Sequence, residues 1–307
     1  MSVNKVAKRL IDHFYGLDGG KSFSEMNMEE YRAATTYFYK FCGPEHAEKV
    51  ALIKDDKIPG PYGDIPIRIY YPNLKPHNSA MIYLRGGGFV LDNLEDEDHV
   101  CRELANETGR IIIAIGFRAA PEYKYPIGLD DSFAVTKWLF NNGELLNINT
   151  NDIAIAGGSA GANFAALVAL RARDAGLNLS KQLLLMPCLD LTSSMPSHKK
   201  YGDGYLLDQE MIDLCFEKYL PNGVDPKDPN VSPLFAKDLT GLPPTLVLTA
   251  ECDPLVDSGR AYYERLKQAK VDAKYHCCLG QIHALLVYRH ALPKQDDPLQ
   301  VIAEFLN

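Results

Sequence analysis

IAIAGGSAGANFAALVALRARDAG, residues 153–176, decides the fold of this chain. An apolar run at 153–157 leads into Gly157-Gly158-Ser159-Ala160-Gly161, and residues 160–175 are rich in helix-forming alanine and leucine. A serine in a G-x-S-x-G turn between a strand and a helix has strained φ/ψ angles, and the turn closes only if its flanking glycines lack side chains. The helix then directs its positive N-terminal end at the serine. We therefore predict Ser159 as a nucleophile, the alternative being a glycine turn that is merely capped by serine.

Further short apolar runs surround this stretch. They are IPIRIYY (65–71), AMIYL (80–84), IIIAI (111–115), QLLLM (182–186) and TLVLT (245–249). Several of these runs are apolar on both faces, which is typical of a parallel sheet covered by helices, whereas residues 65–71 alternate and predict an antiparallel edge. Helices are predicted between the runs, at 95–108, 129–142, 160–175 and 258–270. This alternation predicts an α/β fold with a mostly parallel central sheet and helices on both faces.

Two segments interrupt the alternation. Residues 1–48 are predicted to be helical and carry many aromatic residues, and residues 190–240 are rich in turn formers around one helix at about 208–220. Insertions of this size in sheet proteins are more often lids or binding elements than second cores. We expect a single domain spanning residues 1–307.

The overall composition excludes several classes of function. The chain has 307 residues and a net charge of −8, with 32 basic and 40 acidic side chains, which argues against binding to nucleic acid or to an anionic membrane. The N-terminus has no signal-peptide pattern, and no apolar run approaches the roughly 18 residues of a membrane span. We expect a cytoplasmic protein that acts on a small molecule. The sequence does not decide between a monomer and a homodimer.

The cysteines predict structural thiols rather than disulfides or a metal site. There are seven, an odd number, and no C-x-x-C pair is present. This usage favours a reduced protein with mostly buried thiols. Cys277 and Cys278 beside His276 lie on one predicted strand, which cannot supply tetrahedral metal ligands. No metal is expected.

A serine nucleophile needs a base, and His283 is the best candidate. In this architecture the order along the chain is serine, acid, histidine. His283 lies in LGQIHALL, just after a predicted strand at 273–279, where a loop can reach the edge of the sheet. His276 lies within that strand, and His290 falls further along the chain, in a segment that we expect to be surface or packing.

The predicted acid is Asp253. It lies in the loop that follows the strand at 245–249, and catalytic groups gather at the carboxyl ends of parallel strands. Glu251 and Asp257 are the alternatives. Glu251 is nearer to the strand, and Asp257 is the better N-cap for the helix predicted at 258–270.

LRGGGFVLD, residues 84–92, gives a third part of the site. Acyl transfer passes through a tetrahedral oxyanion, which is stabilised by backbone N–H groups in a dry site. Ala160, the residue after the nucleophile, is predicted to supply one donor. A glycine loop after an early strand supplies the others, because glycine lets the backbone approach the substrate without a Cβ.

Together these motifs resemble the hormone-sensitive-lipase-like branch of the α/β-hydrolases, and especially the bacterial acetyl esterases. The resemblance covers about residues 50–307 and rests on RGGGFVLDNLEDED, FRAAPEYKYP, GGSAGAN, ECDPLVDSGRAYYERL and GQIHALL. It implies a triad of Ser159, Asp253 and His283, and oxyanion donors at Gly87, Gly88 and Ala160. It also implies hydrolysis of small short-chain acyl esters through an acyl-enzyme, with no cofactor. A cap from residues 1–48 and about 190–235 would cover a catalytic core of 49–189 and 236–307.

Three departures from the family pattern stand out. The family usually has histidine at position 85, aspartate at 158 and an aromatic residue at 285, where this chain has Arg85, Gly158 and Leu285. Because that histidine is expected to brace the glycine loop, the sequence predicts that Arg85→His raises turnover. Two alternative functions stay open: a catalytically weak or non-catalytic ligand-binding homologue, and an amidase of the same fold.

Overall fold

The computed structural model of the protein describes residues 3–17, 26–76, 78–293 and 297–307. Its centre is an eight-stranded sheet with the order β1-β2-β4-β3-β5-β6-β7-β8. The strands are β1 (Leu52–Ile58), β2 (Ile65–Tyr71), β3 (Asn78–Leu84), β4 (Ile111–Ile115), β5 (Ile148–Gly158), β6 (Gln182–Leu185), β7 (Thr245–Cys252) and β8 (Ala273–Ile282). β2 pairs antiparallel with both β1 and β4, and every other neighbouring pair is parallel. The prediction of a mostly parallel sheet with an antiparallel edge is therefore confirmed.

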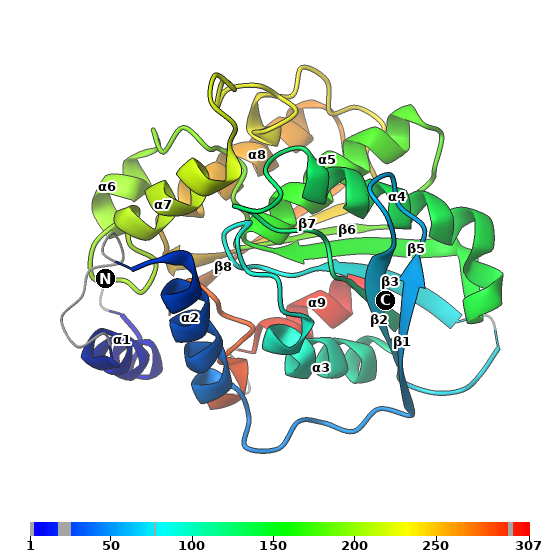
Figure 1. Cartoon of the computed structure of the whole chain (residues 1–307), viewed down its shortest axis with the longest axis horizontal. Coiled ribbons are helices and arrows are strands. Elements are labelled where there is room, and N and C mark those ends of the chain that lie inside the picture. The colour runs from blue at the N-terminus through cyan, green and yellow to red at the C-terminus, as the bar shows by residue number, and fades with distance from the viewer. Residues whose placement is uncertain (1–2, 18–25, 77, 294–296) are drawn as a thin grey trace.

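Helices cover both faces of this sheet (Figure 1). α3 (Asp98–Thr108) and α9 (Pro298–Leu306) lie on one face, and α4 (Ile127–Asn142), α5 (Ala160–Asp174) and α8 (Val256–Gln268) lie on the other. Alternate residues of each strand point to opposite faces, so that Ile82 packs in one core cluster and Met81 in the other. Burial on both faces explains why the central strands are apolar throughout.

Several helix boundaries differ from those predicted by one to three residues; α4, for example, begins at Ile127 rather than at 129. Leu94–Glu97 forms a separate 3₁₀ helix before α3 begins at Asp98, while the end of α3 at left-handed Gly109 is as predicted. α8 begins at Val256 rather than at 258, so Asp257 is not its N-cap. The early start has a local cause: Asp253 accepts the Leu255 N–H through Oδ1 and the Val256 N–H through its carbonyl oxygen, closing a turn before the helix.

The two segments that interrupt the alternation lie near each other in the structure. α1 (Lys5–Leu17) and α2 (Met28–Cys42) come from the N-terminal segment, and α6 (Pro196–Tyr201) and α7 (Gln209–Tyr219) come from the second one (Figure 1). Part of the predicted cap, residues 18–25, lies outside the described residues. Arg32 of α2 donates to the carbonyl oxygens of Val90 and Ala120 at 2.8 and 2.9 Å, which ties this segment to the loops of the core.

Two further features concern the thiols and the helices. All seven cysteines are free, and all are buried except the half-buried Cys277. Among the described residues, no helix is both long enough and apolar enough to span a membrane.

Candidate active site

The four parts of the predicted site each follow directly after a strand. Ser159 follows β5, Asp253 follows β7, His283 follows β8, and the glycine loop, defined here as residues 85–91, follows β3. Because these strands run parallel, their carboxyl ends meet at one edge of the sheet, where sites on such sheets are usually built. The sheet therefore gathers at one edge residues that are up to about 200 positions apart in the sequence.

Ser159 stands at the tip of a strained turn, as the sequence predicted. Its backbone has φ 52° and ψ −116°, outside the regions that residues with side chains favour. A Cβ at Gly157 would lie 2.3 Å from the carbonyl oxygen of Gly161, and a Cβ at Gly161 would lie 2.0 Å from that of Leu84. Both glycines are therefore required by close backbone contacts. We call residues 157–161 the serine turn.

The serine turn is also tied to its surroundings by hydrogen bonds. The Ser159 N–H donates to Leu185 O at 2.9 Å, and Ser159 O accepts the Cys188 N–H at 3.2 Å. Asn163, one turn into α5, donates from Nδ2 to the carbonyl oxygens of Cys188 and Val231, each at 2.9 Å. These bonds offset part of the local strain, which persists only where the surrounding structure holds it.

His283 and Asp253 form a buried pair. The Nδ1 atom of His283 lies 2.7 Å from Oδ2 of Asp253, and the two side chains are 8% and 0% exposed. Oδ1 of Asp253 accepts the Leu255 N–H at 2.9 Å, which orients the carboxylate. A carboxylate in this position holds the imidazole in one tautomer and one orientation, leaving Nε2 to act on a neighbouring hydroxyl.

The alternative acids and bases occupy other positions. Glu251 accepts the Gly280 N–H at 2.8 Å and thus links β7 to β8, and Asp257 accepts the Ser197 N–H at 2.9 Å. His276 lies exposed within β8, and His290 lies exposed in a 3₁₀ helix. Each has a location that accounts for it without a catalytic role.

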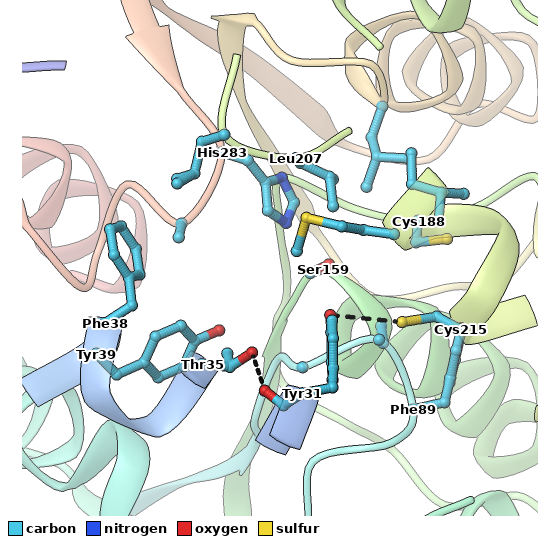
Figure 2. A pocket seen from close by; sticks show the side chains of 18 of the residues that line it. Tyr31, Thr35, Phe38, Tyr39, Phe89, Ser159, Cys188, Leu207, Cys215 and His283 are labelled. Carbon is cyan, nitrogen blue, oxygen red and sulfur yellow. Dashed lines mark hydrogen bonds between the residues drawn. The ribbon is translucent and has the colours of Figure 1, made fainter. Parts of the chain in front are cut away.

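Ser159 and His283 line the same apolar cavity, whose volume is about 80 Å³. Figure 2 shows Tyr31, Phe38 and Tyr39 of α2 facing it from one side and Cys215 of α7 from another. Tyr31 and Cys215 approach each other across it, with 3.7 Å between the hydroxyl oxygen and the sulfur. The family resemblance implied a cap from the two interrupting segments, but the sequence analysis named none of these side chains. A helical aromatic stripe does not by itself reveal which residues face a cavity.

The thiols in this cavity are poor nucleophiles. Burial raises the pKa of Cys215 to about 11 and raises the pKa of Cys188 well above its usual value. Because the thiolate is the reactive form, both cysteines are protonated and unreactive near neutral pH. Ser159, which stands on the strained serine turn, lines this cavity together with His283.

The glycine loop presents bare backbone to the same cavity. Gly87 and Gly88 both line it and have φ angles of 102° and 60°, which favour glycine. A Cβ would lie 2.5 Å from the Leu91 side chain at Gly87 and 2.4 Å from the Cys215 sulfur at Gly88. In the part of the chain that the structure describes, the N–H groups of Gly87, Gly88 and Ala160 donate to no acceptor.

Arg85 is buried at the start of the glycine loop. Its guanidinium donates to the carbonyl oxygen of Leu91 and lies 4.1 Å from the centre of the Phe117 ring. Within the described residues its Nε and Nη1 atoms have no hydrogen-bond partner, and burial lowers its pKa to about 10. Arg85 thus joins the two ends of the loop, a role that the sequence assigned to the histidine that it replaces.

Glu97 is the residue that sequence reasoning misjudged. The helix predicted at 95–108 places Glu97 in its first turn, yet the Glu97 side chain is buried and turns inward toward the glycine loop. One carboxylate oxygen accepts the Gly86 N–H at 3.2 Å, and the other accepts the Tyr83 hydroxyl at 2.7 Å. Burial raises the pKa of Glu97, while these hydrogen bonds and the nearby charge of Arg85 act to lower it. The available signal was a cation, Arg85, between an apolar run and three glycines, ten residues before the acidic run that starts at Glu95.

Among the described residues, no group of three or more histidine, cysteine, aspartate or glutamate side chains is placed to hold a metal ion.

Comparison with known proteins places the chain in a family. A family model described as alpha/beta hydrolase fold matches residues 81–287, more than half of the chain. An arylesterase from Saccharolobus solfataricus is 36% identical over 240 residues, which are 78% of this chain and 78% of that protein. An acetyl esterase from Salmonella choleraesuis is 35% identical over 256 residues, or 81% of this chain and 77% of that protein.

The fold is similar to that of a solved esterase. A hyperthermophilic esterase from the archaeon Pyrobaculum calidifontis superimposes with a TM-score of 0.95 at 32% sequence identity. The match covers 100% of this chain and 98% of that one, so it includes the segments that the family model leaves out.

Proposed function

The chain belongs to the alpha/beta hydrolase fold family and is a carboxylic ester hydrolase of that family, and we propose that it is a serine esterase acting on small short-chain acyl esters. Ser159 is the nucleophile, His283 the base and Asp253 the residue that orients the base. The observation that carries this proposal is the buried 2.7 Å contact between His283 and Asp253 beside the cavity that Ser159 lines.

The first half of the reaction forms an acyl-enzyme. The Ser159 hydroxyl attacks the ester carbonyl while Nε2 of His283 takes its proton. The carbonyl oxygen becomes an oxyanion, and the N–H groups of Gly87, Gly88 and Ala160 are the donors available to it. The N-terminal end of α5 adds a favourable field for this negative charge. His283 then protonates the departing alkoxide as the ester bond breaks.

The dimensions of the cavity support a short acyl chain. Its volume of about 80 Å³ is far below the roughly 300–1,000 Å³ of pockets that enclose drug-sized ligands. Bulky side chains close it, among them Phe38, Met211 and Phe216. An acetyl or similarly short group fits such a space, whereas a long chain requires these side chains to move.

Replacing the nucleophile tests the proposal most directly. We expect Ser159→Ala to lower the turnover of p-nitrophenyl acetate by about 10⁴-fold or more, because loss of the nucleophile alone removes most of the rate enhancement that a catalytic triad provides. Ser194→Ala, which removes an exposed hydroxyl, is the matched control and should retain wild-type turnover. Retained hydrolysis in the Ser159 variant would exclude this serine as the nucleophile.

Two substrate comparisons define the specificity. In a series of p-nitrophenyl esters from acetate to decanoate, decanoate should be slower than acetate by at least about 10-fold, since a pocket discriminates methylenes by size. A matched ester and amide of one acyl group separate an esterase from the amidase alternative, because fold and triad do not distinguish them.

A further inference from the structure

A second, smaller cavity adjoins the apolar cavity of about 80 Å³ that Ser159 and His283 line, which we call the larger cavity. It shares Ser159, His283, Tyr39 and Ala284 with the larger cavity. Away from this shared wall it is bounded by residues that the larger cavity does not touch, including Tyr83, Gly86, Glu97 and Gly158. We call this second space the small chamber. The proposed nucleophile and base therefore face two separate spaces.

The small chamber has the size of one water molecule. Its volume is about 20 Å³, and a cavity needs roughly 10–15 Å³ on this measure to hold a single water. It has no room for an acyl chain or for an alcohol, methanol included. Any ligand that it takes beside Ser159 and His283 is therefore water-sized.

One wall of the chamber offers hydrogen-bond acceptors. A carboxylate has about four acceptor positions, and Glu97 uses two of them, for the Gly86 N–H and the Tyr83 hydroxyl. A Cβ built on Gly86 would lie 3.1 Å from Oε1 of Glu97 and 3.7 Å from the Cβ of Ser159. The carboxylate and the serine thus flank Gly86 closely, and the remaining acceptor capacity of Glu97 can orient a water beside Ser159.

Gly158 keeps this space open. A Cβ built on Gly158 would meet only the Tyr83 hydroxyl, at 3.8 Å, so a side chain here would project into free volume. Its neighbour Gly157 has no such space, because a Cβ there would lie 2.3 Å from the Gly161 carbonyl oxygen. Steric contact explains the glycine at 157 but does not explain the one at 158. The glycine at 158 is explained by the small chamber, because a side chain there would fill part of it.

We propose that the small chamber holds the water that hydrolyses the acyl-enzyme, with Glu97 and Tyr83 as positioning residues. This inference rests on the proposed serine esterase function. His283 takes a proton from this water as the water oxygen bonds to the acyl carbon. The bond between that carbon and Ser159 Oγ then breaks, His283 returns the proton to Oγ, and the carboxylic acid leaves. The water approaches from the chamber while the acyl group still occupies the larger cavity.

The test compares water with methanol as acceptors of the acyl group. Wild-type enzyme, Gly158→Ala and the control Gly16→Ala, an exposed glycine with open space around it, hydrolyse p-nitrophenyl acetate in the presence of methanol. Acetate and methyl acetate are then quantified. Methanol is too large for the chamber and reaches the acyl-enzyme through the larger cavity. We expect Gly158→Ala to raise the ratio of methyl acetate to acetate by about 10-fold, because the added methyl group displaces the positioned water.

Two further measurements separate the outcomes. The rate at which a fluorophosphonate labels Ser159 should be the same in Gly158→Ala and wild type, which shows that the nucleophile is intact. Tyr83→Phe, which removes a chamber hydroxyl without filling space, should shift the product ratio in the same direction. An unchanged ratio in both variants, or equal loss of both products, overturns the role of the chamber. Failure of the wild type to be labelled or to form methyl acetate instead refutes the serine esterase itself.

Discussion

The serine turn and the glycine loop border the same cavity but are held in place by different interactions. Both follow neighbouring parallel strands, since Leu84 of β3 is paired with Gly157 of β5, and both border the larger cavity. The serine turn is held by contacts between backbone atoms that glycine alone permits. The glycine loop is held from both sides by buried charged groups, with Arg85 on the Leu91 carbonyl oxygen and Glu97 on the Gly86 N–H.

This difference shows why one half of the site is visible in the sequence and the other is not. Steric exclusion acts at Gly157 and Gly161, four positions apart, and leaves a local signature of glycines. Charged side chains act through burial, and a sequence does not state which acids are buried. Substitutions in the serine turn, at Glu97 and at Arg85 test this contrast.

Gly157→Ala should be the most damaging change. The added Cβ would lie 2.3 Å from a backbone carbonyl oxygen, and backbone cannot move aside as a flexible side chain can. We expect fluorophosphonate labelling of Ser159 to slow by about 100-fold or more, because displacing a reacting group by about 1 Å costs that much. The free energy of unfolding should fall by about 2–3 kcal/mol, as measured in urea.

Gly158→Ala is the matched control for that variant. It makes the same chemical change one residue later, where a Cβ has open space. Its labelling rate and stability should stay near those of wild type. If the two variants were equally damaging, steric exclusion at one position would not explain the turn.

Glu97→Gln should have an intermediate effect. The substitution preserves shape but removes the charge and replaces one acceptor oxygen by a donor, so either the Gly86 N–H loses its acceptor or the Tyr83 hydroxyl must accept where it now donates. We expect kcat for p-nitrophenyl acetate to fall by about 20-fold, less than the 10²–10³ for removing an oxyanion donor, because the donors are displaced rather than deleted. KM should change little if the loop acts mainly on the transition state.

Glu95→Gln provides the comparison for this acid. Glu95 lies two residues earlier, is exposed, and pairs with Arg68 at 2.6 Å. Exposed ion pairs contribute little, so this variant should keep wild-type kcat. Equal losses in both variants would mean that the charge of the acidic run matters, and not the buried position of Glu97.

Arg85→His should have the smallest effect, and the structure reverses the direction that the sequence suggested. An imidazole is too short to keep both the Leu91 carbonyl bond and the contact with the Phe117 ring. The substitution also removes two buried guanidinium nitrogens that have no partner among the described residues, and this gain offsets part of the lost contacts. We expect kcat to fall by about 3-fold, consistent with the loss of one cation–π contact with Phe117. A rise in kcat would restore the interpretation that histidine is the better brace.

Much of the fold and the centre of the candidate site could be predicted from the sequence. The apolar runs marked the buried strands because a strand covered on both faces has no polar side, and the one alternating run marked the antiparallel edge. Ser159, Asp253 and His283 were singled out by their places after strands, and each of them does follow a strand directly. Helix starts were less certain: α8 begins two residues early because a turn at Asp253, invisible in the residue pattern, starts it.

The sequence by itself determined where the chain must bend and which strands must be buried, because both follow from local sterics and from the spacing of apolar residues. The tertiary structure alone decided what Arg85, Glu97 and Gly158 do. Arg85 and Glu97 are twelve residues apart in the chain and bind opposite ends of the glycine loop, and Gly158 borders a chamber that no single segment encloses. A buried charge or an open space is a property of the surroundings, and only the folded chain supplies them.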